Sequence, residues 1–319
     1  MISGFEYYFN LFIFLIPQNF IFSGLNMVQK SFTRVTLALD IVKKIEDGPF
    51  KGFHELSIIK HQISLHDIIN IIPSDSLQIE CDNPLVPCDD RNICWKAVKL
   101  INSECGINEN VKINIKKNIP VMGGLAGGSA NAATVLMMLN KLWNLNLKEE
   151  KLKNLGRKLG MDVPFYFEGK TAFDSEATSY LYRIPSSLHL VFVLAIPDFG
   201  VSTAEAYKGI DYSETGKNKE LTRSMIDSFR SNNRVGVLNA MHNDFEPVLF
   251  RIYPEIENVK KQLISAGCER AVVSGSGSTV LGVAKDIDTA RKICGNMNCR
   301  TIISESLNSC NQTFSKADN

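Results

Sequence analysis

The chain has 319 residues, which is enough for one large domain or two medium ones, and two is the better expectation. Its 35 basic and 34 acidic residues give a formal net charge of +1, and no basic stripe interleaved with aromatic residues is present. This balance argues against electrostatic recruitment of nucleic acid. The eight cysteines lack CxxC spacing and neighbouring histidines. They are therefore interpreted as incidental thiols of a reduced cytoplasmic protein rather than as a zinc site or a disulfide framework.

The N-terminus contains an apolar run at residues 9–16 that suggests a signal sequence or a membrane anchor. The run is too short to span a bilayer, and Glu6 precedes it without any Lys or Arg. Met27 then begins a segment typical of a cytoplasmic start. We interpret residues 1–26 as a mis-assigned upstream extension and expect no membrane association, with a membrane anchor as the alternative.

The first predicted strand covers residues 31–41 and alternates as a half-buried strand does. One face carries four aliphatic side chains: Val35, Leu37, Leu39 and Ile41. The opposite face carries Arg34, Thr36, Ala38 and Asp40. Two short strands are predicted next, at residues 56–59 and 67–72.

A turn-rich loop at residues 46–55 separates the first strand from the next. Within it Phe53 is followed by His54, a pair that is able to grip a planar ring. The alternative is that Phe53 packs within its loop and that His54 is an ordinary surface group.

A glycine-rich loop at residues 120–131 stands between a predicted strand at residues 111–115 and a helix that continues past Asn131. A further helix is predicted earlier, at residues 92–101. Glycines at a helix N-terminus allow an anion to approach unpaired N–H groups, so a phosphate chain is the favoured ligand. No Gly-Lys-Ser/Thr closes the loop, which excludes the Walker pattern. A flexible turn without function is the alternative.

Asp162 is a single carboxylate in the otherwise apolar run at residues 161–167. It follows a short predicted helix that ends at Gly160. A charge in apolar surroundings costs stability unless it is paired or functional. A local cap or salt bridge explains Asp162 as well as a catalytic role does.

The second half of the chain begins with a strand at residues 190–196 and a polar stretch, residues 214–235, that is helical or mobile. The elements after it are a helix through Ile256, Val259 and Leu263, a strand at 271–274, the hairpin Gly275-Ser276-Gly277-Ser278, a strand at 279–284, a helix at 286–296 and a strand at 301–304. With the first strand, this order is β-α-β-β-α-β, that of a ferredoxin-like sandwich. The hairpin offers N–H and hydroxyl groups to a ligand, although it is also plausible as a plain turn.

Three separated blocks resemble the motifs of the GHMP small-molecule kinases. They are the phosphate loop at residues 120–133, the aspartate segment at 160–165 and the glycine-serine loop at 274–279. Further blocks resemble the branch of that family that phosphorylates 4-diphosphocytidyl-2-C-methyl-D-erythritol: Gly52-Phe53-His54, residues 201–207 and residues 243–246. The resemblance extends over residues 31–306 in collinear order.

The resemblance implies an α+β fold with two domains. The first, at residues 27–180, is a ribosomal-protein-S5-domain-2-like domain that binds ATP. The second, at residues 181–308, is a ferredoxin-like βαββαβ domain. The chain is expected to be a monomer or a homodimer.

The resemblance also implies a site for ATP, Mg²⁺ and a cytidine diphosphate-linked methylerythritol, with no metal ligand assigned. Asp162 would orient or deprotonate the substrate hydroxyl, and Arg34 would offset charge on the transferred phosphoryl group. The residues implied to bind the nucleotide are Asn92, Lys117, Pro120, Gly123, Gly124, Leu125, Ala126, Gly127, Gly128, Ser129 and Asn131. The residues implied to bind the substrate are Thr36, Phe53, His54, Thr203, Tyr207, Gly275, Ser276 and Gly277. Phe53 and Tyr207 would stack on the cytosine.

Five positions depart from the family pattern: Arg34 stands for the usual lysine, Thr36 for asparagine, Phe53 for tyrosine, Ala126 for glycine and Ala130 for serine. The loop at residues 47–52 also carries extra residues relative to that pattern. Arginine stays protonated, so Arg34 stabilises charge but does not exchange a proton. The alternatives are another GHMP kinase, acting on mevalonate or homoserine, or a nucleotide-binding homologue that has lost catalysis. A nucleic-acid-binding role rests on fold analogy alone.

Overall fold

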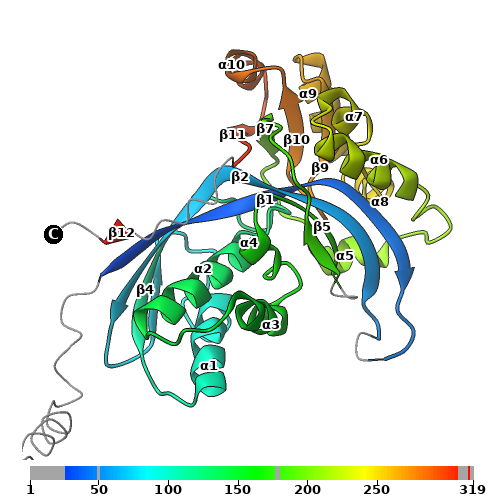
Figure 1. The fold of residues 1–319 in the computed structure, drawn as a ribbon. Helices are drawn as coiled ribbons and strands as arrows, with labels where there is room; N and C mark the ends of the chain where they lie inside the picture. Colours follow the sequence, from blue (N-terminus) through cyan, green and yellow to red (C-terminus); the bar gives the residue numbers. More distant parts are fainter. Residues whose placement is uncertain (1–25, 49–50, 177–179, 308–314, 317–319) are drawn as a thin grey trace, which may run out of the picture.

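The computed structural model describes residues 26–48, 51–176, 180–307 and 315–316. The predicted upstream extension, apart from its last residue, lies outside these ranges. Within them, no helix combines the length and the apolar character that a membrane crossing requires. Two sheets with their covering helices organise this part of the chain (Figure 1).

The larger sheet has the strand order β12-β1-β2-β4-β3, with β5 paired to β2 and β6, and β8 paired to β1. Its two long strands, β1 and β2, pair antiparallel along most of their length. The bounds are β1 (Met27–Lys44), β2 (His54–Pro73), β3 (Gln78–Cys81), β4 (Val111–Lys116), β5 (Thr171–Glu176), β6 (Leu181–Arg183), β8 (His242–Asn243) and β12 (Ser315–Lys316).

One face of the larger sheet is covered by helices α1 to α4 (Figure 1). Their bounds are α1 (Ile93–Cys105), α2 (Gly127–Leu142), α3 (Glu149–Leu159) and α4 (Phe165–Glu168). Aliphatic residues of β2 and β4, such as Ile69 and Ile113, form one core cluster with Val98 of α1 and Leu139 of α2. This packing holds the N-terminus of α2 in a fixed position beside β1.

The smaller sheet has the order β11-β7-β10-β9 and is antiparallel throughout. Its strands are β7 (Val191–Ile196), β9 (Arg270–Val273), β10 (Val280–Ala284) and β11 (Arg300–Glu305). The helices of this half are α5 (Thr203–Lys208), α6 (Lys219–Arg230), α7 (Arg234–Asn239), α8 (Glu246–Ile252), α9 (Pro254–Ser265) and α10 (Ile287–Gly295). With β7, α9, β9, β10, α10 and β11 in chain order, the predicted ferredoxin-like arrangement is confirmed.

Two strand predictions are wrong, the first in the burial of the strand and the second in its extent. β1 is buried on both faces rather than half-buried, because α2 packs near it on one side and the smaller sheet and α6 on the other. Arg34 and Thr36 are consequently only 6% and 2% exposed. β2 is one continuous strand rather than two, and its middle was missed because the buried residues Lys60, His61 and Gln62 read as polar loop.

Candidate active site

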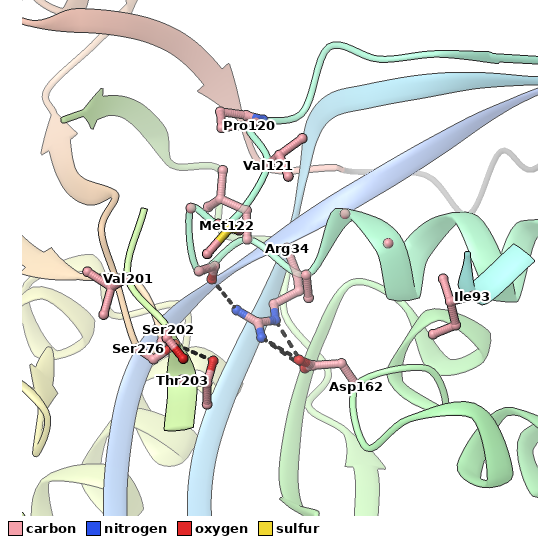
Figure 2. A pocket seen from close by; sticks show the side chains of 18 of the residues that line it. Arg34, Ile93, Pro120, Val121, Met122, Asp162, Val201, Ser202, Thr203 and Ser276 are labelled. Atoms are coloured by element: carbon pink, nitrogen blue, oxygen red, sulfur yellow. Dashed lines mark hydrogen bonds and ion pairs between the residues drawn. The ribbon is translucent and has the colours of Figure 1, made fainter. Parts of the chain in front are cut away.

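A cavity of about 650 Å³ lies between β1, the glycine-rich segment that precedes α2, and the β9–β10 hairpin (Figure 2). Most of the predicted site residues line it: Arg34, Thr36, Asn92, Lys117, Pro120, Gly123, Gly124, Leu125, Ala126, Gly127, Gly128, Asn131, Asp162, Thr203, Tyr207, Gly275, Ser276 and Gly277. Three predicted residues are outside the lining: Phe53, His54 and Ser129. The tertiary structure therefore gathers residues from both halves of the chain around one cavity.

The glycine-rich loop before α2 and the glycine-serine hairpin between β9 and β10 contact each other beside this cavity. Gly124 has a φ of +71°, and a Cβ at this position would collide with the backbone oxygens of Ser274 and Gly277. The Ser274 hydroxyl donates to the Gly124 carbonyl at 3.2 Å, and the Thr279 N–H donates to the Gly123 carbonyl at 3.3 Å. Only glycine satisfies both the backbone conformation and the close approach at position 124.

The N-terminus of α2 opens toward the cavity. The helix begins at Gly127, after Ala126 in a left-handed conformation, and no side chain caps it. The first turn carries no acidic residue. The N–H groups of this turn and the positive end of the helix dipole are therefore available to an anion such as phosphate.

A buried carboxylate that the sequence analysis did not identify holds the glycine-rich loop in place through hydrogen bonds. Asp67 is fully buried and accepts hydrogen bonds from the Lys117 ammonium at 2.8 Å and from the Asn131 amide at 2.9 Å. It also accepts from the backbone N–H groups of Asn118 and Ile119, each at 2.8 Å. Lys117 and Asn131 line the cavity as predicted, and their contacts with Asp67 position the loop that β4 leads into.

Asn92 shapes the opposite wall. Its side-chain oxygen accepts from the Cys94 N–H at 2.8 Å and so caps α1, while its amide donates to the Pro87 carbonyl at 2.7 Å. Pro87 is itself in the cavity lining. Asn92 thus fixes this wall in addition to lining the cavity.

Asp162 is held by two cations at the centre of the site. The Arg34 guanidinium from β1 donates to its two oxygens at 2.9 and 2.8 Å (Figure 2). The Lys60 ammonium from β2 lies 2.8 Å from the same carboxylate and 2.7 Å from Asp174. Arg34 also donates to the Gly124 carbonyl at 2.8 Å, which ties the charge cluster to the phosphate loop.

The charges around Asp162 decide its protonation. Burial by itself raises the pKa of this carboxyl, but the charges of Arg34 and Lys60 and their hydrogen bonds outweigh burial and hold its pKa well below the usual range. Asp162 is therefore a carboxylate throughout the physiological pH range. Such a group accepts a hydrogen bond from an alcohol and orients its oxygen, and it is a weak base.

Aromatic rings gather at the other end of the cavity. The His54 ring stacks on Tyr207 with centroids 4.2 Å apart and on Tyr212 with centroids 5.7 Å apart. Tyr207 packs edge-to-face against Phe245 at 4.9 Å. Phe53, the other predicted stacking residue, is 49% exposed. Burial and the nearby Lys44 charge lower the pKa of His54, which favours the neutral ring at pH 7.

Thr203 connects α5 to the hairpin. Its hydroxyl lies 2.9 Å from the Ser276 hydroxyl, and a dashed line joins the two side chains in Figure 2. This contact joins two of the predicted substrate-side residues. Tyr207, one turn further along α5, is positioned by the same helix.

Comparison with known proteins agrees with this geometry. The model of the GHMP kinases N terminal domain matches residues 92–170, and that of the GHMP kinases C terminal domain matches residues 225–302. A 4-diphosphocytidyl-2-C-methyl-D-erythritol kinase of Clostridium botulinum (strain Eklund 17B / Type B) is 37% identical over 265 residues, which cover 82% of this chain and 92% of that protein. The chain belongs to the GHMP kinase family. It is an ATP-dependent small-molecule kinase.

Solved structures of other GHMP kinases have the same fold. A crystal structure of 4-(cytidine 5'-diphospho)-2C-methyl-D-erythritol kinase superposes with a TM-score of 0.73 at 26% identity, covering 88% of this chain and 98% of that one. Homoserine kinase from Cytophaga hutchinsonii superposes with a TM-score of 0.70 at 16% identity, covering 91% and 97%. The second likeness concerns the fold alone. The predicted GHMP kinase fold is thus confirmed.

Proposed function

We propose that this GHMP kinase transfers the γ-phosphoryl group of ATP to the 2-hydroxyl of 4-diphosphocytidyl-2-C-methyl-D-erythritol in the non-mevalonate isoprenoid pathway. The observation that carries the proposal is a single cavity with a phosphate cradle at one end, Asp162 at its centre and a stack of aromatic rings at the other end. The 37% identical relative named for this activity supports the choice of substrate.

The nucleotide end is formed by the phosphate loop and the start of α2. The loop N–H groups at residues 123–128 and the helix dipole bind the phosphates of ATP, with Ser129 within the first turn. Lys117 and Asn131 hold the loop through Asp67. Asn92 and Pro87 form the wall on the nucleotide side.

The chemical step joins the substrate hydroxyl oxygen to the γ-phosphorus. The bond between that phosphorus and the β–γ bridging oxygen breaks, ADP leaves, and the hydroxyl proton passes to solvent water. Asp162 accepts the hydrogen bond of the hydroxyl and aligns the oxygen for attack, while Arg34 stabilises charge on the transferred group. Positioning and electrostatic stabilisation supply most of the rate enhancement in such transfers.

Mg²⁺ fits this site as part of the nucleotide complex. Among the described residues that line the cavity, Asp162 is the one carboxylate, and the described chain has no cluster of three or more His, Cys, Asp or Glu. Mg²⁺ commonly keeps several waters and binds through phosphates with one or two carboxylates. A bound ion would neutralise phosphate charge, and Asp162 is the lining carboxylate that would contact it or its waters.

The cytosine is recognised at the aromatic end. Tyr207 and Phe53 stack on its two faces, and the neutral His54 ring hydrogen-bonds its edge. Thr36, Thr203 and the hairpin residues Gly275, Ser276 and Gly277 contact the remainder of the substrate. A cytoplasmic location belongs to the same proposal, and the seven described cysteines, which are all free thiols, are consistent with it.

The test is an ADP-release assay with three alcohols: the cytidine-linked methylerythritol, mevalonate and homoserine. We expect saturable release with the cytidine substrate alone. Turnover of mevalonate or homoserine instead identifies another GHMP kinase and refutes the substrate. ATP binding without ADP release from any of the three identifies a homologue that has lost catalysis.

A further inference from the structure

Lys60 is a charged residue in the middle of β2 that is completely buried. A buried ammonium is costly unless carboxylates pair with it, and here both Asp162 and Asp174 do, at 2.8 and 2.7 Å. Lys60 is not among the residues that line the cavity. It therefore acts on the site through Asp162 and not by lining the cavity.

The two oxygens of Asp162 accept different numbers of hydrogen bonds. Oδ1 accepts from Arg34 Nε at 3.3 Å, from an Arg34 terminal nitrogen at 2.9 Å and from Lys60 Nζ at 2.8 Å. Among the described residues, Oδ2 accepts only from the same Arg34 terminal nitrogen, at 2.8 Å. A carboxylate oxygen has room for about two hydrogen bonds in its plane, so Oδ2 is the oxygen that retains capacity for an alcohol.

The anchor of Asp162 is more rigid than the segment that carries Asp162. Lys60 and Asp174 lie on adjacent antiparallel strands, where Lys60 pairs with Ala172 and Asp174 pairs with Ile58. Asp162 lies in the turn between α3 and α4. Groups on paired strands hold their positions better than groups on turns, so the strand pair fixes the turn.

We propose that Lys60 is a positioning residue that holds Oδ1 of Asp162 and thereby leaves Oδ2 for the substrate hydroxyl, with Asp174 orienting the Lys60 ammonium. The inference rests on the proposed phosphoryl transfer in this cavity. Lys60 contacts Oδ1 of Asp162, whereas Arg34 contacts both carboxylate oxygens and also the Gly124 carbonyl. Its loss therefore disturbs the orientation of Asp162 while leaving the phosphate loop tied to Arg34.

The direct test is the Lys60→Met variant. We expect kcat to fall by about tenfold or more, because misaligned catalytic groups lose that much, with the KM for ATP within about twofold of wild type. The acid limb of the kcat–pH profile moves to higher pH, since removal of one cation raises the pKa of Asp162. Lys60→Arg, which keeps the cation, recovers part of kcat and moves the limb back.

A second variant distinguishes a loss of catalysis from a loss of folding. Lys60→Met alone leaves Asp174 buried without this partner, so the double variant Lys60→Met with Asp174→Ala removes both charges together. Its thermal unfolding shows whether the fold is intact. Lys260→Met is the matched control, because it removes another lysine ion pair, with Glu246 at 2.7 Å, from helices outside the cavity lining. It should lower the unfolding temperature without moving the acid limb.

A carbon-13 NMR titration of the Asp162 carboxyl provides a readout that needs no substrate. We expect its titration in the double variant to occur at higher pH than in wild type. A folded double variant with unchanged Asp162 titration, or with unchanged kcat and acid limb, overturns the role of Lys60. Failure of the proposed function is distinguishable, because it appears as wild-type protein inactive on the cytidine substrate while the NMR comparison still decides the role of Lys60.

Discussion

The two ends of the cavity are built in different ways. At the phosphoryl-transfer end, buried charges from paired strands hold the carboxylate: Arg34 and Lys60 contact Asp162 at hydrogen-bond distance, and Asp174 pairs with Lys60. At the base end, the partly exposed rings of His54, the first residue of β2, and of Tyr207 in the short helix α5 stack on one another. The first arrangement exists before any ligand arrives, whereas the second has to open to admit a cytosine between rings.

This difference separates turnover from recognition. A preorganised charge cluster lowers the barrier of the chemical step and appears in kcat. At the base end, a protein ring in the stack is replaced by the cytosine of the substrate. Such stacking contributes to substrate affinity, so its loss appears in KM. Substitutions at the two ends should therefore affect different kinetic constants.

The largest effect is expected for Asp162→Asn. The amide keeps the shape but does not accept the hydroxyl and both cations as a carboxylate does, so kcat should fall by about 100-fold or more. The KM for the cytidine substrate should change much less. Steady-state kinetics with a circular dichroism check of folding measures both, and near-normal turnover would remove Asp162 from the chemical step.

A neighbour of Lys60 on β2 should affect stability and not turnover. His61 is buried, with its ring nitrogens 2.8 Å from the Thr171 and Ser306 hydroxyls. Burial, with a smaller contribution from His189, lowers its pKa from 6.5 to about 4. Between these values only the unfolded chain takes up the proton, so the free energy of unfolding should fall by about 3 kcal/mol as the pH drops from 6.5 to 4.

Urea unfolding of wild type and His61→Gln at several pH values isolates this contribution from that of the carboxylates. The variant should lose less stability than wild type over the same interval. Equal pH dependence of the two proteins would contradict the assignment.

At the base end, Tyr207→Ala should raise the KM for the cytidine substrate by about tenfold, the effect of losing one base–aromatic stack. The KM for ATP and kcat should stay close to wild type. Tyr207→Phe is the control because it keeps the ring. If the alanine variant binds the cytidine substrate as wild type does, the aromatic end does not recognise the base.

The smallest effect is expected at Ala126, which has a φ of +52° before α2. A left-handed conformation strains a residue with a Cβ, so Ala126→Gly should stabilise the protein by about 0.5–1 kcal/mol. Ala130→Gly, inside the same helix, is the matched control and should destabilise by about 1 kcal/mol or more. Chemical denaturation measures both, and a destabilised Ala126→Gly variant would show that position 126 is unstrained.

The element types were largely predictable because their signals are local. The apolar spacing of α9 and α10, the strand at residues 111–115 and Gly160 after α3 are all present in the structure. The middle of β2 was not predictable, because Lys60 and His61 are buried by partners on β5 and after β11 that the local pattern does not contain. Short elements such as β6 and α7 carry too few residues for a period to be recognised.

The sequence by itself determined the phosphate loop, the isolated Asp162 and the glycine-serine hairpin, since each depends on residue types within a few positions. Only the tertiary structure decided that Gly124 lies against the hairpin, that Asp67 braces the loop, and that Lys60 reaches Asp162. These contacts join residues that are dozens to more than a hundred positions apart. Their energies depend on burial and distance, which exist only once the sheets have paired.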